Sequence, residues 1–225
     1  MNTTRRRREN LERKLIEASI AGDIHTISIL IMNGVDANCA DERGMTPLHH
    51  ACLADDLPAA RFLVGEKRME LGFYSRDEAV RTPERDAASE LIMNVSDVNA
   101  KNNRGSRPMH IAALKGGKGM IAILSSHGGS IEARDGKGKT PLVEAACYDN
   151  FRALEEFIRA GSDPNAPDYD GMRALHYAAN NGNIAAIKFL KKAGALPMLQ
   201  NNEGNLPFEL ALWQGHEAAA RLLRI

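Results

Sequence analysis

The sequence predicts an all-α solenoid, a stack of about six helix-turn-helix units that are joined by hairpin tips and carry one inserted helical segment. The first observation is that glycine recurs with a constant period of 33, each time followed three positions later by proline or alanine. These pairs are Gly105 and Pro108, Gly138 and Pro141, Gly171 and Ala174, and Gly204 and Pro207. The second observation is that each unit holds only two short apolar stretches. Helices this short cannot bury their apolar faces alone, so neighbouring units must stack.

An earlier pair, Gly44 and Pro47, sets the unit boundaries in the first half of the chain. The interval from Gly44 to Gly105 is one period of 33 plus an insertion of 28. We therefore expect a basic N-terminal overhang over residues 1–10 and a single repeat domain over residues 11–225. The units are residues 11–40, 41–100 with an insertion at 63–90, 101–133, 134–166, 167–199 and 200–225.

Cap and turn residues mark both helices of a unit. Thr46-Pro47 and Thr140-Pro141 are typical of a helix start, because the threonine hydroxyl caps free N–H groups and proline has none to satisfy. The first helix is expected to end where glycine, or an aspartate that tolerates it, enters the left-handed region. These residues are Gly116, Gly182 and Gly215, and Asp55 and Asp149. The second helix is expected to end at Gly128, Gly161 or Gly194.

The stretch from Gly44 to Ala51, with its Thr46-Pro47-Leu48-His49 core, resembles the signature of the ankyrin repeat. More divergent copies run over residues 108–113 and 174–179, and the resemblance covers nearly the whole chain outside residues 63–90. In this family the signature histidine links turns to helix ends, which implies a structural role for His49, His110 and His176. Arg107, Arg173 and Leu206 stand in place of the capping threonine, so these units are expected to be locally less stable.

The insertion has two interpretations. Ser75-Arg76-Asp77-Glu78 fits a capping box and Thr82-Pro83 fits a helix start, so helices are expected near residues 75–81 and 83–93. The segment is either a tolerated surface excursion on the outer helix layer or a knob that docks a partner. The N-terminal arginines Arg5 to Arg8 are likewise either a solvated overhang or a cluster for nuclear localisation or phosphate binding.

Composition and motifs argue against an enzyme and against a nucleic-acid or membrane-surface protein. Twenty-nine basic and 29 acidic residues give a net charge of zero, whereas such surfaces attract proteins with excess positive charge. No metal-binding, nucleophile or phosphate-loop motif occurs, so we expect no cofactor, no metal site and no catalytic residue. We interpret the three cysteines as thiols of a reducing compartment, which predicts a location in the cytoplasm or the nucleus. Cys147 falls on the exposed side of an inner helix, where it is open to reaction.

The family resemblance implies a protein-binding scaffold, most simply a monomer, that contacts a partner protein or peptide with its hairpin tips and inner-helix ends. Carried over position by position, the expected contact residues are Arg43, Met45, Arg104, Lys115, Lys137, Lys139, Tyr148, Tyr169, Asp170, Met172, Asn181, Glu203 and Trp213. Tyr148, Tyr169 and Trp213 are the expected aromatic anchors, with a core-packing lid as the alternative for Trp213. The alternative function is a regulatory or targeting subunit of an enzyme assembly, such as a pathogen effector, that uses residues 63–90 for contact.

Overall fold

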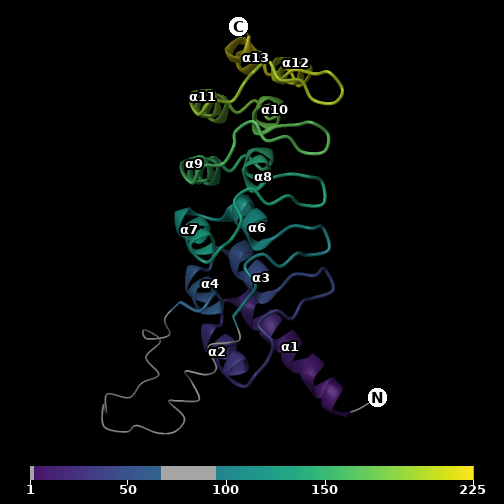
Figure 1. The fold of residues 1–225 in the computed structure, drawn as a ribbon, viewed down its shortest axis with the longest axis vertical. Coiled ribbons are helices and arrows are strands. Elements are labelled where there is room, and N and C mark those ends of the chain that lie inside the picture. Colours follow the sequence, from purple (N-terminus) through teal and green to yellow (C-terminus); the bar gives the residue numbers. More distant parts are fainter. Residues whose placement is uncertain (1–2, 67–94, 225) are drawn as a thin grey trace, which may run out of the picture.

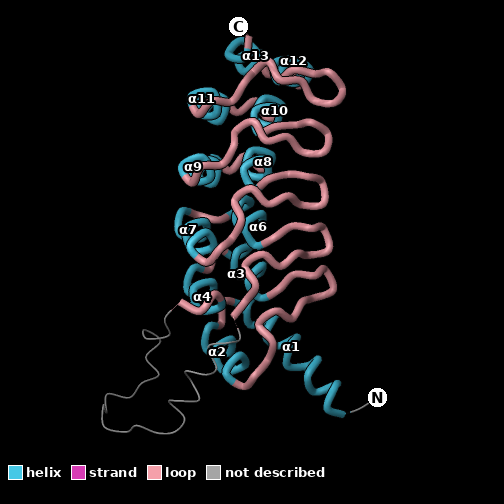
Figure 2. The backbone as a smooth tube through the Cα atoms, in the orientation of Figure 1, coloured by secondary structure: helices cyan, strands magenta, loops and turns pink. Residues whose placement is uncertain are grey.

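The computed structural model describes residues 3–66 and 95–224, and these form a solenoid of two helix layers with a row of hairpin loops along one side (Figures 1 and 2). The inner layer, next to the loops, is α1 (Thr3–Ala21), α3 (Pro47–Ala54), α6 (Pro108–Lys115), α8 (Pro141–Cys147), α10 (Ala174–Asn180) and α12 (Pro207–Trp213). The outer layer is α2 (Ile24–Met32), α4 (Leu57–Leu63), α7 (Lys118–Ser126), α9 (Phe151–Arg159), α11 (Ile184–Lys192) and α13 (Glu217–Leu223). The all-α solenoid is confirmed, and no strand occurs within the described ranges.

The helices begin where the sequence predicts them to begin. Thr46 and Thr140 precede α3 and α8 in extended conformation, and the Val143 N–H donates to Thr140 Oγ1 at 3.3 Å. Four outer helices are capped by an aspartate or asparagine side chain that accepts a backbone N–H from the first turn. These caps are Asp23 of α2, Asp56 of α4, Asn150 of α9 and Asn183 of α11. Each cap satisfies a donor that has no partner within the helix.

Most of the inner helices also end as predicted. Asp55 and Asp149 adopt positive φ angles of 54° and 62°, and Gly182 also lies in the left-handed region. The prediction for Gly116 is wrong, because its φ is −62° and its ψ is 136°. The following Gly117 N–H donates to Asp55 Oδ1 of the preceding unit at 3.1 Å. This contact between units directs the chain into an extended path at the point where a left-handed turn was expected.

A single continuous core runs through the stack, built from equivalent positions of successive units. One inner-layer position is buried in five units, as Leu15, Leu48, Met109, Leu142 and Leu175. One outer-layer position is buried in six units, as Leu30, Leu63, Leu124, Phe157, Leu190 and Leu223. Each apolar side chain is therefore covered by neighbouring units as well as by its own, which is how short helices reach full burial.

The repeat continues past the expected start of the insertion at residue 63. Leu63 belongs to the buried outer-layer series, and its carbonyl accepts the Ser96 N–H at 2.9 Å, as the Leu30 carbonyl accepts the Val35 N–H. Gly65, with φ 84°, closes α4. The repeat pattern therefore extends through Gly65. Its expected end at residue 90 and the helices expected near 75–81 and 83–93 lie outside the described residues.

The N-terminal overhang is helical and continuous with the first unit. Helix α1 starts at Thr3, and its N-terminal part projects from the stack (Figure 1). Residues 5–10 are exposed, as expected for an overhang, and Arg5 and Arg8 pair with Glu9 and Glu12 one turn later. These i,i+4 pairs support a helix beyond the edge of the core.

Candidate protein-binding surface

Each hairpin tip is closed by an aspartate or asparagine at one repeat position. In the first tip, Asp41 Oδ1 accepts the Arg43 and Met45 N–H groups, both at 2.8 Å. The same pair of bonds recurs at Asn102, Asp135, Asp168 and Asn201. This turn points the residue two places later into solvent. In the five tips that residue is Arg43, Arg104, Lys137, Asp170 and Glu203, all exposed.

Backbone hydrogen bonds tie each tip to the next. The Asn103 N–H donates to the Arg43 carbonyl at 3.0 Å, and the Gly136 N–H donates to the Arg104 carbonyl at 2.9 Å. The Tyr169 and Asn202 N–H groups repeat this bond in the next two junctions, both at 3.0 Å. The five exposed charges therefore form a regular row, one per unit, on a bonded backbone. Along this row the charge changes from basic in the first three tips to acidic in the last two.

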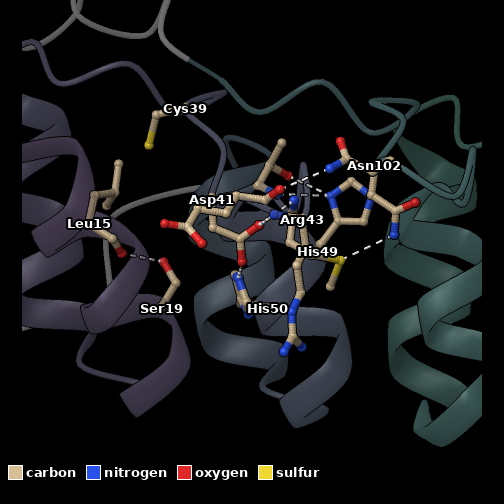
Figure 3. A network of polar contacts seen from close by, with 12 residues as sticks. Leu15, Ser19, Cys39, Asp41, Arg43, His49, His50 and Asn102 are labelled. Atoms are coloured by element: carbon tan, nitrogen blue, oxygen red, sulfur yellow. Dashed lines mark hydrogen bonds and ion pairs between the residues drawn. The ribbon is translucent and has the colours of Figure 1, made fainter. Parts of the chain in front are cut away.

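The signature histidines link turns to helix ends, as the resemblance implied, and they also join consecutive units. Figure 3 shows this for His49. His49 Nδ1 accepts the Thr46 N–H at 3.2 Å, and its Nε2 lies 3.1 Å from the Ser106 carbonyl of the next unit. His110 and His176 make the same two contacts, across to Lys139 and Asn205. Burial lowers the pKa of His49 and of His176 to about 4, so both rings are neutral at ordinary pH. These rings act as structural links.

The connecting turns carry a second link between units. The Asn165 side chain donates to the Gly194 carbonyl at 3.0 Å and accepts the Leu196 N–H at 2.9 Å. Asn99 and Asn38 bridge the same two backbone positions in earlier units. One carboxamide thus satisfies both a donor and an acceptor of the following unit.

The arginine at position 173 has a function of its own in the stack. Its guanidinium donates to the carbonyls of Asn165, Gly171 and Gln200, the last in the next unit. The sequence predicted a weaker unit here because the capping threonine is missing. Three charge-assisted hydrogen bonds compensate for that missing cap. Glu209 similarly replaces the histidine of the last unit, since its carboxylate accepts the Leu206 N–H at 2.7 Å.

Most of the expected contact residues are exposed. They are Arg43, Arg104, Lys115, Lys137, Tyr148, Tyr169, Asp170, Asn181, Glu203 and Trp213, while Met172 is half-buried. Two of the expected contact residues have mostly buried side chains. Met45 is only 8% exposed, and its sulfur lies 3.2 Å from the Asn102 side-chain nitrogen. The Lys139 side chain is only 12% exposed, because its amine turns inward to the Glu144 carboxylate and does not reach solvent at the tip.

The three aromatic anchors are open to solvent. Tyr148 is 57% exposed, Tyr169 is 65% exposed and Trp213 is 67% exposed. The core-packing alternative for Trp213 is therefore wrong. Gly138 lies against the Tyr169 ring so closely that a Cβ there would overlap it. The ring thus lies against the preceding tip and is still mostly exposed.

The sequence analysis did not identify Ile20, an exposed apolar residue of the first unit. Ile20, near the end of α1, is exposed, as is Leu53 near the end of α3. The two are separated by one repeat period, so they occupy the same inner-helix position as Cys147 and Trp213 in later units. That spacing was the signal that could have identified Ile20.

Family models match most of the chain. A model described as "Ankyrin repeats (3 copies)" matches residues 78–168 and 145–224, and one described as "Ankyrin repeats (many copies)" matches residues 15–64. This chain belongs to the ankyrin repeat family. The helix pairs, the hairpin row and the histidine links described above are its ankyrin features.

Several curated proteins align with about half of this ankyrin chain. "NF-kappa-B inhibitor cactus" of Drosophila melanogaster is 32% identical over 123 residues, which are 51% of this chain and 23% of that protein. "Putative ankyrin repeat protein FPV230" of fowlpox virus is 30% identical over 125 residues, 52% of this chain and 65% of that protein. Human "Neurogenic locus notch homolog protein 1" is 36% identical over 119 residues, 50% of this chain and 5% of that protein.

Two further properties bear on what the ankyrin surface can do. No helix within residues 3–66 and 95–224 is long and apolar enough to cross a membrane. In the same ranges, no three histidine, cysteine, aspartate or glutamate side chains come together in a group that could hold a metal ion.

Proposed function

We propose that this chain is a non-enzymatic protein-binding module that holds a partner protein or peptide along its hairpin tips and inner-helix ends. The observation that carries the proposal is the exposure of Tyr148, Tyr169 and Trp213, which belong to three consecutive units. Aromatic side chains supply much of the energy of protein interfaces, because they bury a large area at a small entropic cost. A binding role also agrees with membership of the ankyrin repeat family.

The row of tip charges gives this surface a direction. Arg43, Arg104 and Lys137 form its basic half, with Lys115 exposed at an inner-helix end, and Asp170 and Glu203 form its acidic half. A partner with an acidic end and a basic end would bind lengthwise in one orientation. Such complementarity raises the association rate and selects the partner more than it raises affinity.

The cellular setting belongs to the same proposal. The three cysteines are unpaired, in keeping with the reducing interior of a cell and with a cytoplasmic or nuclear location. We further propose that the chain acts as a monomer and has no nucleic-acid ligand, since its tip charges change sign along the row.

A pull-down from the native host, read by mass spectrometry, identifies the partner. Four baits would be compared: the wild-type chain, Tyr148→Ala, Tyr169→Ala and a deletion of residues 66–90. The proposal predicts that the two tyrosine variants lose partner and that the deletion retains it. The opposite pattern would transfer the contact to the insertion and favour a regulatory or targeting subunit.

Once the partner is identified, calorimetry measures how much each aromatic anchor contributes to the binding free energy. Tyr148→Ala and Tyr169→Ala should each weaken binding by about 1–3 kcal/mol, the range of ordinary hot spots. Met198→Ala is the matched control, since Met198 is as exposed as Tyr148 but lies outside the tips and inner-helix ends. Charge reversal of Arg43 and Arg104 to glutamate should mainly slow association. Wild-type affinity in both tyrosine variants would exclude this surface.

A further inference from the structure

One unit departs from its neighbours at three positions that come together beside the inner helix α8. The first position holds Lys139 here, against Met45, Ser106, Met172 and Asn205 in the other units. The second holds Glu144, against His50, Ile111, Tyr177 and Leu210, and the third holds Cys147, against Leu53, Leu114, Asn180 and Trp213. An amine, a carboxyl and a thiol thus replace side chains that are mostly apolar. The repeat itself does not require any of the three.

These three groups contact one another. Lys139 Nζ lies 3.2 Å from Cys147 Sγ and 3.5 Å from Glu144 Oε2. The same nitrogen lies 4.7 Å from the centre of the Tyr177 ring, and the Tyr177 hydroxyl donates to Asp168 Oδ2 at 2.7 Å. The amine is therefore held between a sulfur, a carboxyl oxygen and an aromatic face. Cys147 itself is partly exposed, unlike the other two cysteines.

Glu144 shares the Lys139 amine with Cys147. The side chain is 13% exposed, and its buried Oε2 has no hydrogen-bond partner within the described residues. Burial is the largest effect on the Glu144 carboxyl and raises its pKa. Burial acts to lower the pKa of Lys139, but hydrogen bonding to Cys147 and the charge of Glu144 outweigh it and raise that pKa overall. An ammonium therefore lies at hydrogen-bond distance from the sulfur.

The other two cysteines have no such environment. Cys52 is fully buried, and burial raises its pKa strongly. Burial also raises the pKa of Cys39 to about 12, and its sulfur faces the Glu12 carbonyl. Both sulfurs are kept as thiols and shielded from solvent, so they serve as internal references for the reactivity of Cys147.

We propose that Cys147 is a modification site for small hydroperoxides, with Lys139 as the positioning residue whose ammonium donates a hydrogen bond to the sulfur. The thiolate attacks one peroxide oxygen, the S–O bond forms and the O–O bond breaks. Sulfur is oxidised to a sulfenic acid while hydrogen peroxide is reduced to hydroxide, which takes a proton from the Lys139 ammonium and leaves as water. Solvent then returns the proton to the amine.

The position of this thiol gives its oxidation a consequence for binding. Cys147 directly precedes the exposed anchor Tyr148, so a sulfenic acid or a mixed disulfide there adds a polar or bulky group at the docking surface. This consequence rests on the proposed function. The reactivity of the thiol does not, and it is measured on the chain alone without any partner.

The test treats the full chain with an equimolar amount of hydrogen peroxide and traps sulfenic acid with dimedone. Peptide mass spectrometry should place the adduct on Cys147 and leave Cys39 and Cys52 unmodified. Lys139→Met introduces methionine, the residue that two other units have at this position. It should slow formation of the adduct by about ten-fold or more, because the ammonium is lost. Lys188→Met is the control, since that exposed amine belongs to the outer helix α11 and lies outside the docking surface, and it should react as the wild type does.

A second variant keeps the test decisive if Lys139→Met does not fold, as judged by circular dichroism. Glu144→Gln removes the carboxyl that shares the ammonium, so the adduct should form as fast as in the wild type or faster. A slower reaction in Glu144→Gln overturns the proposal. Equal rates in wild-type and folded Lys139→Met chains overturn it as well, as does an adduct spread over all three cysteines.

Discussion

Acidification should destabilise the stack through its buried histidines. His49 and His176 are fully buried, and each Nδ1 accepts a backbone N–H, at Thr46 and Arg173. A proton on Nδ1 would place a donor against that N–H and break the bond that starts the helix. Burial lowers the pKa of both rings from 6.5 to about 4, so the folded state takes up protons only at lower pH than the unfolded chain.

The sign and the size of this loss of stability follow from the difference in proton binding between the folded and the unfolded chain. Between pH 6.5 and about 4 the unfolded chain binds more protons, so the free energy of unfolding falls as pH falls through that window. At about pH 5 the loss relative to about pH 7.5 is roughly 2 kcal/mol for each ring. The pKa of His110 is also lowered by burial, and its loss has the same sign. The pKa of Glu144 is raised by burial, so protonation of that carboxyl offsets part of the loss.

Urea unfolding, followed by circular dichroism at both pH values, measures this loss. His49→Gln is the informative variant, because a glutamine oxygen can still accept the Thr46 N–H, as Glu209 accepts that of Leu206, but it does not titrate. In this variant the pH-dependent loss should shrink by about 2 kcal/mol. His25→Gln, at an exposed histidine of α2, is the control and should keep the full loss. An equal loss in wild type, His49→Gln and His176→Gln would refute the reasoning.

Three other perturbations test the scaffold. Gly138→Ala should lower the free energy of unfolding by about 1–3 kcal/mol in urea titrations, since φ is 77° there and the new Cβ would overlap the Tyr169 ring. Asn165→Ala should lower the free energy of unfolding by about 1–2 kcal/mol, because two hydrogen bonds to the next unit are lost. An unchanged free energy of unfolding would show that these two bonds do not stabilise the stack. Deletion of residues 66–90 should leave unfolding cooperative, because loop length alters stability only weakly; a broad, multi-step transition would show that the segment belongs to the stack.

Much of the fold could be predicted because its rules are local in the chain. Thr140 caps a helix, Asp149 takes a left-handed conformation and Asp135 closes a tip, each through atoms within a few residues of itself. Residue type alone encodes such preferences. Their recurrence once per repeat period fixed the register of the units. The ankyrin resemblance, carried over position by position, implied that Tyr148 and Tyr169 lie on the contact surface, and both are exposed.

The errors all involve contacts between segments that are distant in sequence or belong to different elements. Lys139 was expected at an exposed tip, but the buried carboxyl of Glu144 draws its amine inward. Gly116 was expected to turn left-handed, but Asp55 of the preceding unit holds the next N–H. The insertion was expected from residue 63. The Ser96 N–H, from a distant part of the chain, donates to the Leu63 carbonyl and keeps that residue within the repeat pattern.

The sequence by itself determined the period, the helix starts and the row of tip charges from Arg43 to Glu203, because these depend on the conformations that each residue type allows. Only the tertiary structure decided which side chains meet across units. It brought the amine of Lys139 to the sulfur of Cys147 and laid the Tyr169 ring on Gly138. The repeat pattern of the sequence indicates which position of the repeat a residue occupies. The direction of its side chain depends on burial and charge supplied by the neighbouring units, and these are set only when the units stack.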